Sequence, residues 1–138
     1  MKKVFLLFLL CVSIFSLKAQ NAGEYDPTFG TDGKVMTAVG DNFNVANDMV
    51  IQPDGKIIVV GKAQFGSYQF AVVRYLTDGS LDNTFGENGI VITSIMNGSY
   101  AMSVALQADE KIIVSGYCFN GSAYNACVAR YLDNGDLD

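Results

Sequence analysis

Few side chains in this chain could carry out chemistry, and histidine, the most versatile of them, is absent. The 138 residues contain no histidine. That absence excludes Ser-His-Asp and Cys-His catalysis, imidazole-bound zinc and histidine acid–base chemistry. Three cysteines are present, and two of them, Cys118 and Cys127, lie in the second half of the chain. The remaining candidates are these thiols, two arginines within apolar stretches, and the carboxylates.

The two arginines, Arg74 and Arg130, each interrupt an apolar stretch, VVRYL and VARYL. They could present guanidinium groups to a channel or to a ligand. An unpaired charge among valines would cost several kcal/mol, however, whereas a carboxylate such as Asp82 or Asp54 would offset that cost. We therefore favour a structural role for both arginines.

Aspartates recur at turns and could bind a hard cation. Asp26, Asp82 and Asp138 stand at D-x-T-F-G positions, and Asp78 and Asn134 each precede a glycine. Oxygen-rich turns bind Ca²⁺, but no segment has the D-x-[DN]-x-[DN]-G spacing of an EF-hand loop. Asp and Asn are ordinary turn residues because their side chains bond the local backbone. We predict turns here, with no metal and no other cofactor.

The chemistry-bearing residues recur because the chain repeats itself. DPTFGTDGKVMT returns as DNTFGENGIVIT, QPDGKIIVVG as QADEKIIVSG, and VVRYLTDGSLD as VARYLDNGDLD. These paired phrases begin at Asp26 and Asp82, at Gln52 and Gln107, and at Val72 and Val128, offsets of 55 or 56 residues. Within the D-x-T-F-G phrase, Phe29, Gly30, Phe85 and Gly86 are expected to be structural, with the phenylalanines packed between neighbouring units.

The repeat divides the chain into segments. We expect a short linker at 20–25, a first repeat at 26–81 and a second at 82–137, with residue 138 beginning a third. A terminal repeat normally carries an atypical capping unit, because a bare repeat leaves an apolar face open. The sequence therefore reads as a fragment of a longer array, whose further repeats are its expected partners.

The N-terminus has the features of a signal peptide. The basic start MKK precedes an apolar run, Val4–Leu17, too short to span a bilayer comfortably, and Ala19 suits a cleavage site. A retained membrane anchor is the alternative. We expect residues 1–19 to be removed and the protein to be exported to the periplasm, the cell surface or the medium. Three of the nine basic residues lie in this leader, so an acidic chain remains that would not bind nucleic acid or, after cleavage, a membrane.

Each copy contains four short β-branched and aromatic segments separated by Gly, Asn and Asp. The expected strands are 34–38, 45–52, 56–62 and 69–76 in the first copy, and 90–94, 100–107, 111–118 and 125–132 in the second. The third and fourth strands are almost continuously apolar, which indicates that both faces are covered. We predict an all-β fold of two antiparallel four-stranded propeller-type blades from an incomplete β-propeller.

Three ordered phrases carry a family resemblance: LDNTFGENGIV, QPDGKIIVVG and FAVVRYLTDGSLD. They resemble the delta-60 repeat, a β-propeller-type tandem repeat of exported bacterial proteins, over essentially the whole chain after the leader. The resemblance implies secreted or surface proteins and no known catalytic activity. QADEK departs from the Pro-Asp-Gly turn, so a looser or different turn is expected at Glu110.

Two groups of residues distinguish the copies. Cys118 and Cys127 replace Ala63 and Ala71, which indicates small buried sites on adjacent strands of an exported protein. Such sites permit either a disulfide or two free buried thiols. The most variable loops carry aromatic rings that would suit contacts with a glycan or a protein. These rings are Tyr68, Tyr100, Tyr117 and Tyr124.

Two functions remain open. We favour a non-enzymatic repeat module for binding, adhesion or scaffolding through the blade loops. The alternative is part of a propeller-type carbohydrate-active or other hydrolytic enzyme, which would need paired carboxylates. Glu110 breaks the repeat, but at a hairpin tip without a visible partner. We expect the sheets to pack through Val59, Ile113, Val72 and Val128, and a two-repeat piece to self-associate.

Overall fold

The computed structural model describes residues 22–138. The predicted signal peptide at 1–19 therefore lies outside the described residues. Seven strands are present: β1 (Val45–Ile51), β2 (Ile57–Phe65), β3 (Ser67–Tyr75), β4 (Ile90–Thr93), β5 (Ser99–Leu106), β6 (Ile112–Phe119) and β7 (Tyr124–Tyr131). Within the described part of the chain no helix is long and apolar enough to cross a membrane.

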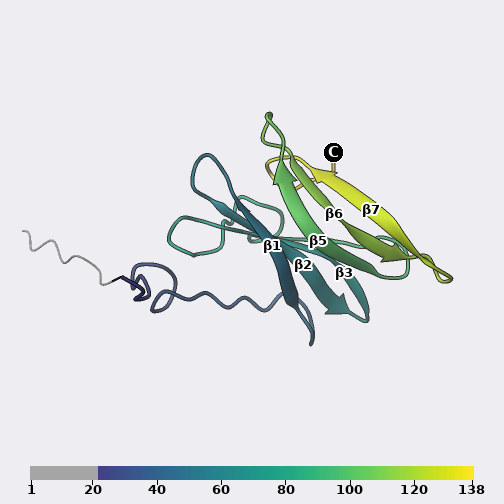
Figure 1. The fold of residues 1–138 in the computed structure, drawn as a ribbon, viewed down its shortest axis with the longest axis horizontal. Helices are drawn as coiled ribbons and strands as arrows, with labels where there is room; N and C mark the ends of the chain where they lie inside the picture. Colours follow the sequence, from purple (N-terminus) through teal and green to yellow (C-terminus); the bar gives the residue numbers. More distant parts are fainter. Residues whose placement is uncertain (1–21) are drawn as a thin grey trace, which may run out of the picture.

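The strands form two antiparallel sheets that pack against each other (Figure 1). Sheet 1 has the order β1-β2-β3-β4, and sheet 2 has the order β5-β6-β7. Neighbours in the sheet are neighbours in the chain. Short turns join the hairpins, whereas the longer stretch 76–89 leads from β3 to β4. Each sheet is a meander of the kind that forms one propeller blade. The fold is all-β, with two blades of an incomplete β-propeller.

The strand count differs from the expectation of four strands in each copy. The predicted strand 34–38 forms only isolated bridges, between Lys34 and Gly30 and between Lys34 and Thr31. Its counterpart in the second copy, β4, pairs with β3 of sheet 1. The first strand of a repeat thus completes the sheet of the preceding repeat. Among the described residues no strand precedes residue 34, so the segment 34–38 has no neighbouring strand with which to form a ladder. Sheet 2 has three strands.

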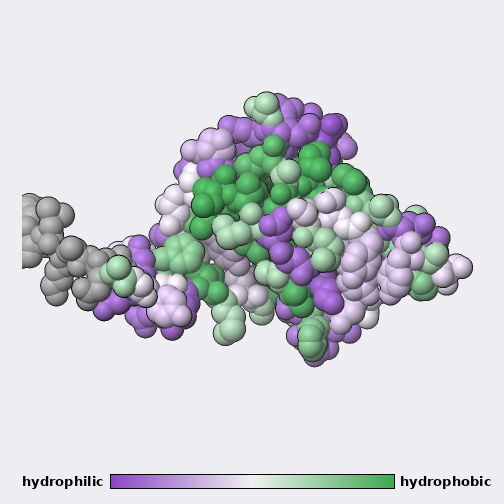
Figure 2. All heavy atoms as spheres, in the orientation of Figure 1, coloured by the Kyte–Doolittle hydropathy of each residue, from purple (hydrophilic) through white to green (hydrophobic). Residues whose placement is uncertain are grey.

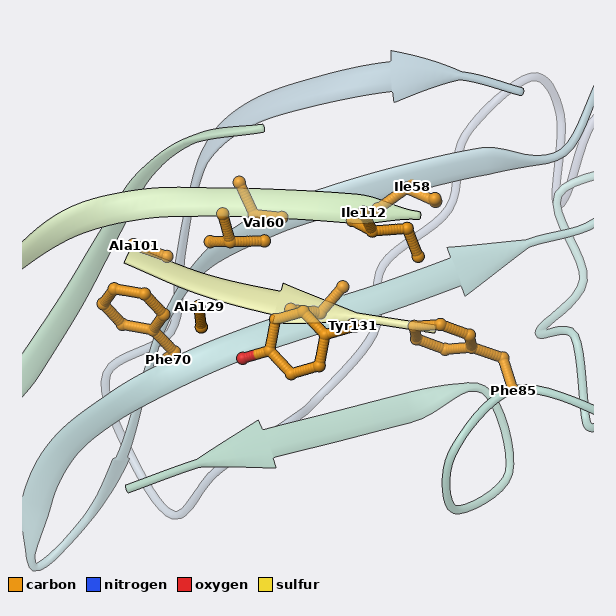
Figure 3. Packing of buried hydrophobic residues seen from close by; sticks show 10 residues of the cluster. Ile58, Val60, Phe70, Phe85, Ala101, Ile112, Ala129 and Tyr131 are labelled. Carbon is orange, nitrogen blue, oxygen red and sulfur yellow. The ribbon is translucent and has the colours of Figure 1, made fainter. Parts of the chain in front are cut away.

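Both faces of the strands carry apolar residues, and the register shows which residues share a face. We call the face of each sheet that carries Ile57 or Ile112 the leading face, and the face that carries Ile58 or Ile113 the trailing face. The trailing face of sheet 1 packs on the leading face of sheet 2 (Figure 3). The core residues are Ile58, Val60, Phe70 and Val72 from sheet 1, Ile112, Val114, Ala129 and Tyr131 from sheet 2, together with Phe85 and Ala101.

Of the four residues predicted to join the sheets, only Val72 does so. Val59 lines an open groove on the leading face of sheet 1, Ile113 is half-buried, and Val128 is 68% exposed. The prediction failed because both faces of these strands are apolar. A shift of one residue along a strand changes the face, and the sequence pattern does not indicate which face meets the neighbouring blade.

The hairpin at Glu110 has the same form as its glycine-containing counterpart, contrary to the expected change of turn. Gly55 N–H donates to Gln52 O at 2.9 Å, and Glu110 N–H donates to Gln107 O at 3.0 Å. Both residues have positive φ, 87° for Gly55 and 65° for Glu110. The tertiary context therefore imposes the left-handed conformation on a residue with a side chain, which is strained there.

Exchanging these residues tests this strain. Glu110→Gly is expected to raise the free energy of unfolding by about 1 kcal/mol, because glycine adopts positive φ without steric cost. Gly55→Ala is expected to lower it by a similar amount, since an added Cβ would also lie 2.9 Å from Thr77 Cγ2. Urea denaturation followed by circular dichroism measures both. A stabilising Gly55→Ala would contradict the turn geometry.

Candidate functional site

The four tyrosines predicted for the variable loops come together at one end of the blades. Tyr68 lies near the start of β3, Tyr100 near the start of β5, Tyr117 near the end of β6 and Tyr124 at the start of β7. In antiparallel sheets, a strand that begins and a neighbour that ends meet at the same edge. The β2–β3 and β6–β7 hairpins and the β4–β5 connection therefore bring these rings together, and we call them the tyrosine cluster.

Tyr100 is the centre of the tyrosine cluster. Its ring centroid lies 4.7 Å from that of Tyr117, with the rings nearly parallel, and 5.2 Å from that of Tyr68. Tyr124 meets Tyr117 edge-to-face at 5.5 Å and Tyr100 at 6.2 Å. These separations fall within the favourable range for aromatic pairs. Because Tyr68 belongs to sheet 1 and the others to sheet 2, the cluster spans both blades.

A lysine that the sequence analysis did not select completes the cluster. The Lys62 ammonium lies 4.3 Å from the Tyr68 centroid and 5.2 Å from that of Tyr100, in the range of cation–π contacts. Lys62 occupies the position that Tyr117 holds in the second copy. In the sequence, its selection could have rested only on its being a single lysine within an apolar strand. Burial, followed by the neighbouring Tyr124, raises the pKa of Tyr100, so its hydroxyl is protonated at neutral pH.

Part of the tyrosine cluster is accessible. Tyr117 is 39% exposed and Tyr124 is 62% exposed, whereas Tyr68 and Tyr100 are half-buried. The β6–β7 turn beside them is held by Asn120, whose Oδ1 accepts hydrogen bonds from the backbone of Ser122 and Ala123, both at 2.9 Å. The site therefore offers ring edges and faces, a nearby cation and a fixed polar turn. Such a surface can bind a ligand but contains no acid–base pair.

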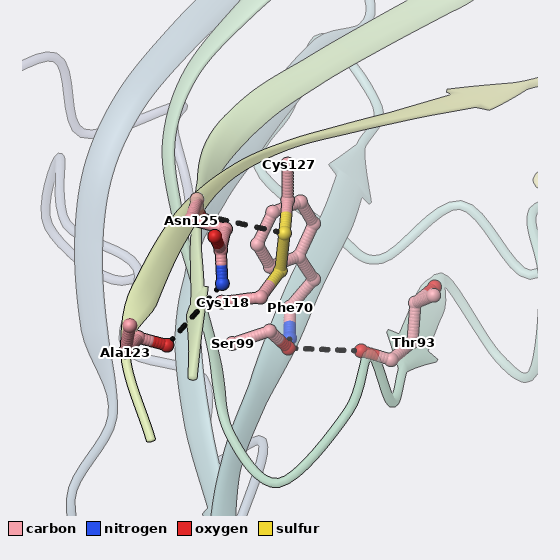
Figure 4. Close-up of a disulfide and its surroundings, with 7 residues drawn as sticks. All are labelled: Phe70, Thr93, Ser99, Cys118, Ala123, Asn125 and Cys127. Atoms are coloured by element: carbon pink, nitrogen blue, oxygen red, sulfur yellow. Dashed lines mark hydrogen bonds between the residues drawn. A yellow bond between two sulfur atoms is a disulfide. The ribbon is translucent and has the colours of Figure 1, made fainter. Parts of the chain in front are cut away.

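A disulfide joins the strands that carry the exposed rings. Cys118 in β6 and Cys127 in β7 are bonded, with their Cα atoms 5.9 Å apart (Figure 4). Both lie on the leading face of sheet 2, and Cys127 packs against the core cluster that contains Phe70 of sheet 1. Their counterparts in the first copy, Ala63 and Ala71, are buried. The disulfide thus lies between the blades and fixes the end of the hairpin that presents Tyr117 and Tyr124.

Arg74 lies in a buried ionic cluster. Its Nε lies 2.8 Å from Asp82 Oδ2, and one terminal nitrogen lies 2.8 Å from Asp133 Oδ1. The same nitrogen donates to the carbonyl of Asp133 at 2.6 Å, and the guanidinium lies 4.6 Å from the Phe85 ring centroid. The Arg74 side chain is 2% exposed, so it faces neither a channel nor solvent. Asp54, the other predicted partner, pairs with Lys56 instead, at 3.2 Å.

Arg130, the counterpart of Arg74, has a different environment. Its side chain is 47% exposed and pairs with Asp138, which also lies 3.3 Å from the Lys111 ammonium. Sheet 2 covers Arg74, whereas among the described residues no further blade covers Arg130. The repeat therefore preserves the Arg–Asp pair, while the neighbouring blade determines whether that pair is buried.

The aspartates of the D-x-T-F-G phrase cap turns. Asp26 Oδ1 accepts hydrogen bonds from Thr28 N–H at 2.9 Å and from the Thr28 hydroxyl at 2.7 Å, and Asp82 and Thr84 repeat this arrangement. Asp78 and Asn134 accept in the same way from the residue two positions on. Among residues 22–138 no group of three metal-ligating side chains is found. These oxygens are occupied by the local turns.

The glycines of that phrase dock each turn onto the following blade. Gly30 N–H donates to Asp78 O at 2.7 Å, and Gly86 N–H donates to Asn134 O at 2.8 Å. An added Cβ on Gly86 would clash with the Val91 side chain. The adjacent phenylalanines differ in burial: Phe85 is fully buried between the blades, and Phe29 lines the open groove.

That groove is a second feature of the surface: the sequence analysis expected an open apolar face but did not name the residues that form it. It lies on the leading face of sheet 1, has a volume of about 460 Å³, and is lined mainly by apolar side chains. Figure 2 shows that apolar residues gather over the strands in the middle of the view. Among the lining residues are Phe29, Val35, Met36, Met49, Val59 and Val73. These residues lie in strands that are apolar on both faces. The corresponding residues of the second copy are covered by sheet 1.

Comparison with known proteins supports the architecture. A family model described as a domain of unknown function (DUF5122) beta-propeller matches two stretches, residues 52–85 and 107–138. The first stretch covers the β2–β3 hairpin and ends within the D-x-T-F-G phrase, and the second covers the β6–β7 hairpin. The chain is therefore similar to this β-propeller family at equivalent places in its two repeats. No curated protein matches the chain.

The disulfide predicts a chemical result. Alkylation of the denatured chain is expected to modify neither Cys118 nor Cys127 before reduction and both after reduction, as measured by intact mass. Reduction is expected to lower the free energy of unfolding by about 2–3 kcal/mol, because the bond closes a short loop. Replacing both cysteines with alanine, as in the first repeat, provides the control. Alkylation of both thiols without reduction would contradict the bond.

The buried ionic cluster predicts an asymmetry between equivalent residues. Asp82→Asn is expected to lower the free energy of unfolding by about 3 kcal/mol, because it leaves the buried Arg74 with one fewer carboxylate. Asp138→Asn, the matched change beside the exposed Arg130, is expected to have little effect. Chemical denaturation of the two variants measures the difference. Equal effects would show that burial of the pair is unimportant.

Asp82 also predicts a dependence on pH. Burial alone would raise its pKa, but hydrogen bonds from Thr84 and the charges of Arg74 and Lys56 outweigh burial and lower it from 3.8 to about 2. A depressed folded-state pKa contributes stability that is fully present above about pH 4 and is lost as the pH falls towards 2. The expected loss is about 2 kcal/mol. Asp82→Asn should flatten the stability profile in this window.

Proposed function

We propose that this chain is a non-enzymatic binding module of an exported repeat protein, and that the tyrosine cluster is its ligand-contacting surface. The observation that supports the proposal is the convergence of four tyrosines from four strands and both blades on one edge. Adhesion or scaffolding would follow, with a glycan or a protein as ligand and with further repeats of the same type as partners along the array.

Rigid aromatic rings suit this role because they provide contact area with little loss of side-chain entropy. The disulfide and the Asn120 turn hold the exposed Tyr117 and Tyr124 in place, so less ordering is needed when a ligand binds. Asn97 contributes an amide next to the same turn, since its Nδ2 would lie 2.9 Å from a Cβ added to Gly121. Stacking surfaces beside amides and hydroxyls favour a glycan as the ligand.

Nothing in the geometry favours the hydrolytic alternative. Asp82 is buried in the ionic cluster, Asp26 and Asp78 cap turns, and Asp48 accepts hydrogen bonds from Ser103 and Val104 between the blades. Glu110 lies at the tip of a hairpin. Asp82, Asp26, Asp78 and Asp48 therefore have structural partners, and none of them is paired with another carboxylate across an accessible cleft.

Glycan binding tests the proposal. The chain is expected to bind selected oligosaccharides on a glycan array, and titration calorimetry on the strongest of them gives the affinity. Tyr124→Ala and Tyr117→Ala are each expected to weaken binding about tenfold or more, because truncated aromatic anchors typically cost over about 1 kcal/mol. Ile51→Ala is the control and should bind normally. Ile51 is exposed and lies at the end of β1 that is away from Lys62 and the tyrosine cluster.

Two results would contradict this proposal. Absence of binding to every glycan on the array would remove the favoured ligand class. Binding that is unchanged in both tyrosine variants would show that the contact surface lies elsewhere.

A further inference from the structure

The ammonium of Lys62 is a cation without a carboxylate partner. Among residues 22–138 it makes no ion pair and no hydrogen bond, and its contacts are with the Tyr68 and Tyr100 rings. The other cations of the strands and hairpins are each paired with an aspartate: Lys56, Arg74, Lys111 and Arg130. The tyrosine cluster therefore contains a positive charge that no group of the described chain neutralises.

Lys62 lies in the contact between sheet 1 and sheet 2, which we call the joint. It projects from β2 on the trailing face of sheet 1, where Tyr68 lies on the same face and Tyr100 arrives from β5 of sheet 2. Both sheets of this joint are described, so the arrangement of the lysine and the two rings needs no further part of the chain. Lys62 is half-buried, so the rings restrict its side chain without removing it from water.

This arrangement leaves the lysine able to bind an anion. An ammonium group has three N–H donors, and contact with ring faces attracts the charge without supplying an ordinary hydrogen-bond acceptor. An anionic group at the cluster can therefore accept a charge-assisted hydrogen bond, which is stronger than one between neutral groups. Because the rings already restrict Lys62, less side-chain entropy is lost when the bond forms.

The carboxylates of the chain are concentrated at the other end of the blades. The connections at the tyrosine end are residues 39–44, 66, 94–98 and 120–123, and Asp41 is their only charged residue. The connections at the opposite end carry most of the described carboxylates, among them Asp54, Asp82, Asp109 and Asp133.

The length of the strands separates these carboxylates from the tyrosine cluster. β1 has 7 residues, which corresponds to about 23 Å at about 3.3 Å per residue. Exposed charges are largely screened beyond about 8 Å at physiological ionic strength. The acidic composition of the chain would by itself repel an anionic ligand, but the fold places most of that negative charge too far away to do so.

We propose that the tyrosine cluster binds an acidic saccharide. Lys62 binds the carboxylate or sulfate group of this ligand, and the aromatic rings contact the faces of its sugars. The inference rests on the proposed function, since it takes a glycan as the ligand, and it adds the chemical class of that glycan. A single lysine does not neutralise a row of phosphates, so a nucleic acid is not the expected ligand.

A glycan array of matched pairs tests the proposal. The pairs are uronic acid saccharides with their methyl esters, and sulfated saccharides with their unsulfated forms. The acidic member of at least one kind of pair is expected to bind the chain about tenfold more tightly than its neutral partner, as measured by titration calorimetry on the strongest pair. The kind of pair that shows the preference distinguishes a carboxylate from a sulfate ligand.

Variants of two lysines assign the preference to one residue. The measured quantity is the ratio of the acidic to the neutral affinity, because loss of a cation–π contact can change both affinities. Lys62→Gln is expected to lower this ratio about tenfold, to near one, and Lys62→Arg, which keeps the charge, should retain it. Lys34→Gln is the matched control: its ammonium also lies over a ring, 5.0 Å from the Tyr25 centroid, but outside the tyrosine cluster. Circular dichroism verifies the fold of each variant.

The outcomes separate this inference from the proposed function. Neutral members that bind as tightly as the acidic ones would overturn the inference and leave a glycan-binding module standing. Absence of binding to every member would overturn both. A preference for the acidic member that persists in Lys62→Gln, or that is lost equally in Lys34→Gln, would also overturn the inference, because the anion would then not be bound by Lys62.

Discussion

Arg74 lies where three parts of the chain meet, and its buried charge constrains how those parts can be arranged. It projects from β3, pairs with Asp82 in the connection to β4, and reaches Asp133 at the end of β7 in the other sheet. A guanidinium removed from water must be paired, and Asp82 and Asp133 both pair with Arg74. The connection to β4 and the end of β7 must therefore both lie beside β3. This requirement fixes the relative position of the two blades together with the apolar packing around Phe85.

The same joint explains why the repeat in the sequence and the blade in the structure are offset. Residues 82–93 begin the second copy, but Asp82 binds Arg74, and β4 completes sheet 1. Each repeat thus carries the last strand of the blade before it. A covalent connection and a hydrogen-bonded strand then hold neighbouring blades together in addition to apolar burial. The groove beside residues 26–39 is the first half of such a joint.

The residues of the tyrosine cluster could be predicted because they follow from local features. Loops that differ between copies and are rich in tyrosine pointed to Tyr68, Tyr100, Tyr117 and Tyr124 one by one. Their mutual distances could not be predicted, because they depend on how sheet 1 and sheet 2 are rotated relative to each other. Lys62 was missed for the same reason: it becomes part of the site only when Tyr100 arrives from the other blade.

The sequence by itself determined the repeat, the all-β class and the order of the hairpins, since strand patterns and turn residues act over short distances. It also indicated that Ala63 and Ala71, and hence Cys118 and Cys127, occupy small buried sites. The tertiary structure alone decided which face of each sheet is covered, and so placed Val59 and Val128 outside the joint. It also decided that residues 34–38 form no strand and that Glu110 adopts positive φ. Both depend on a neighbouring strand or blade, and a strand that is apolar on both faces contains no local information about which neighbour will cover it.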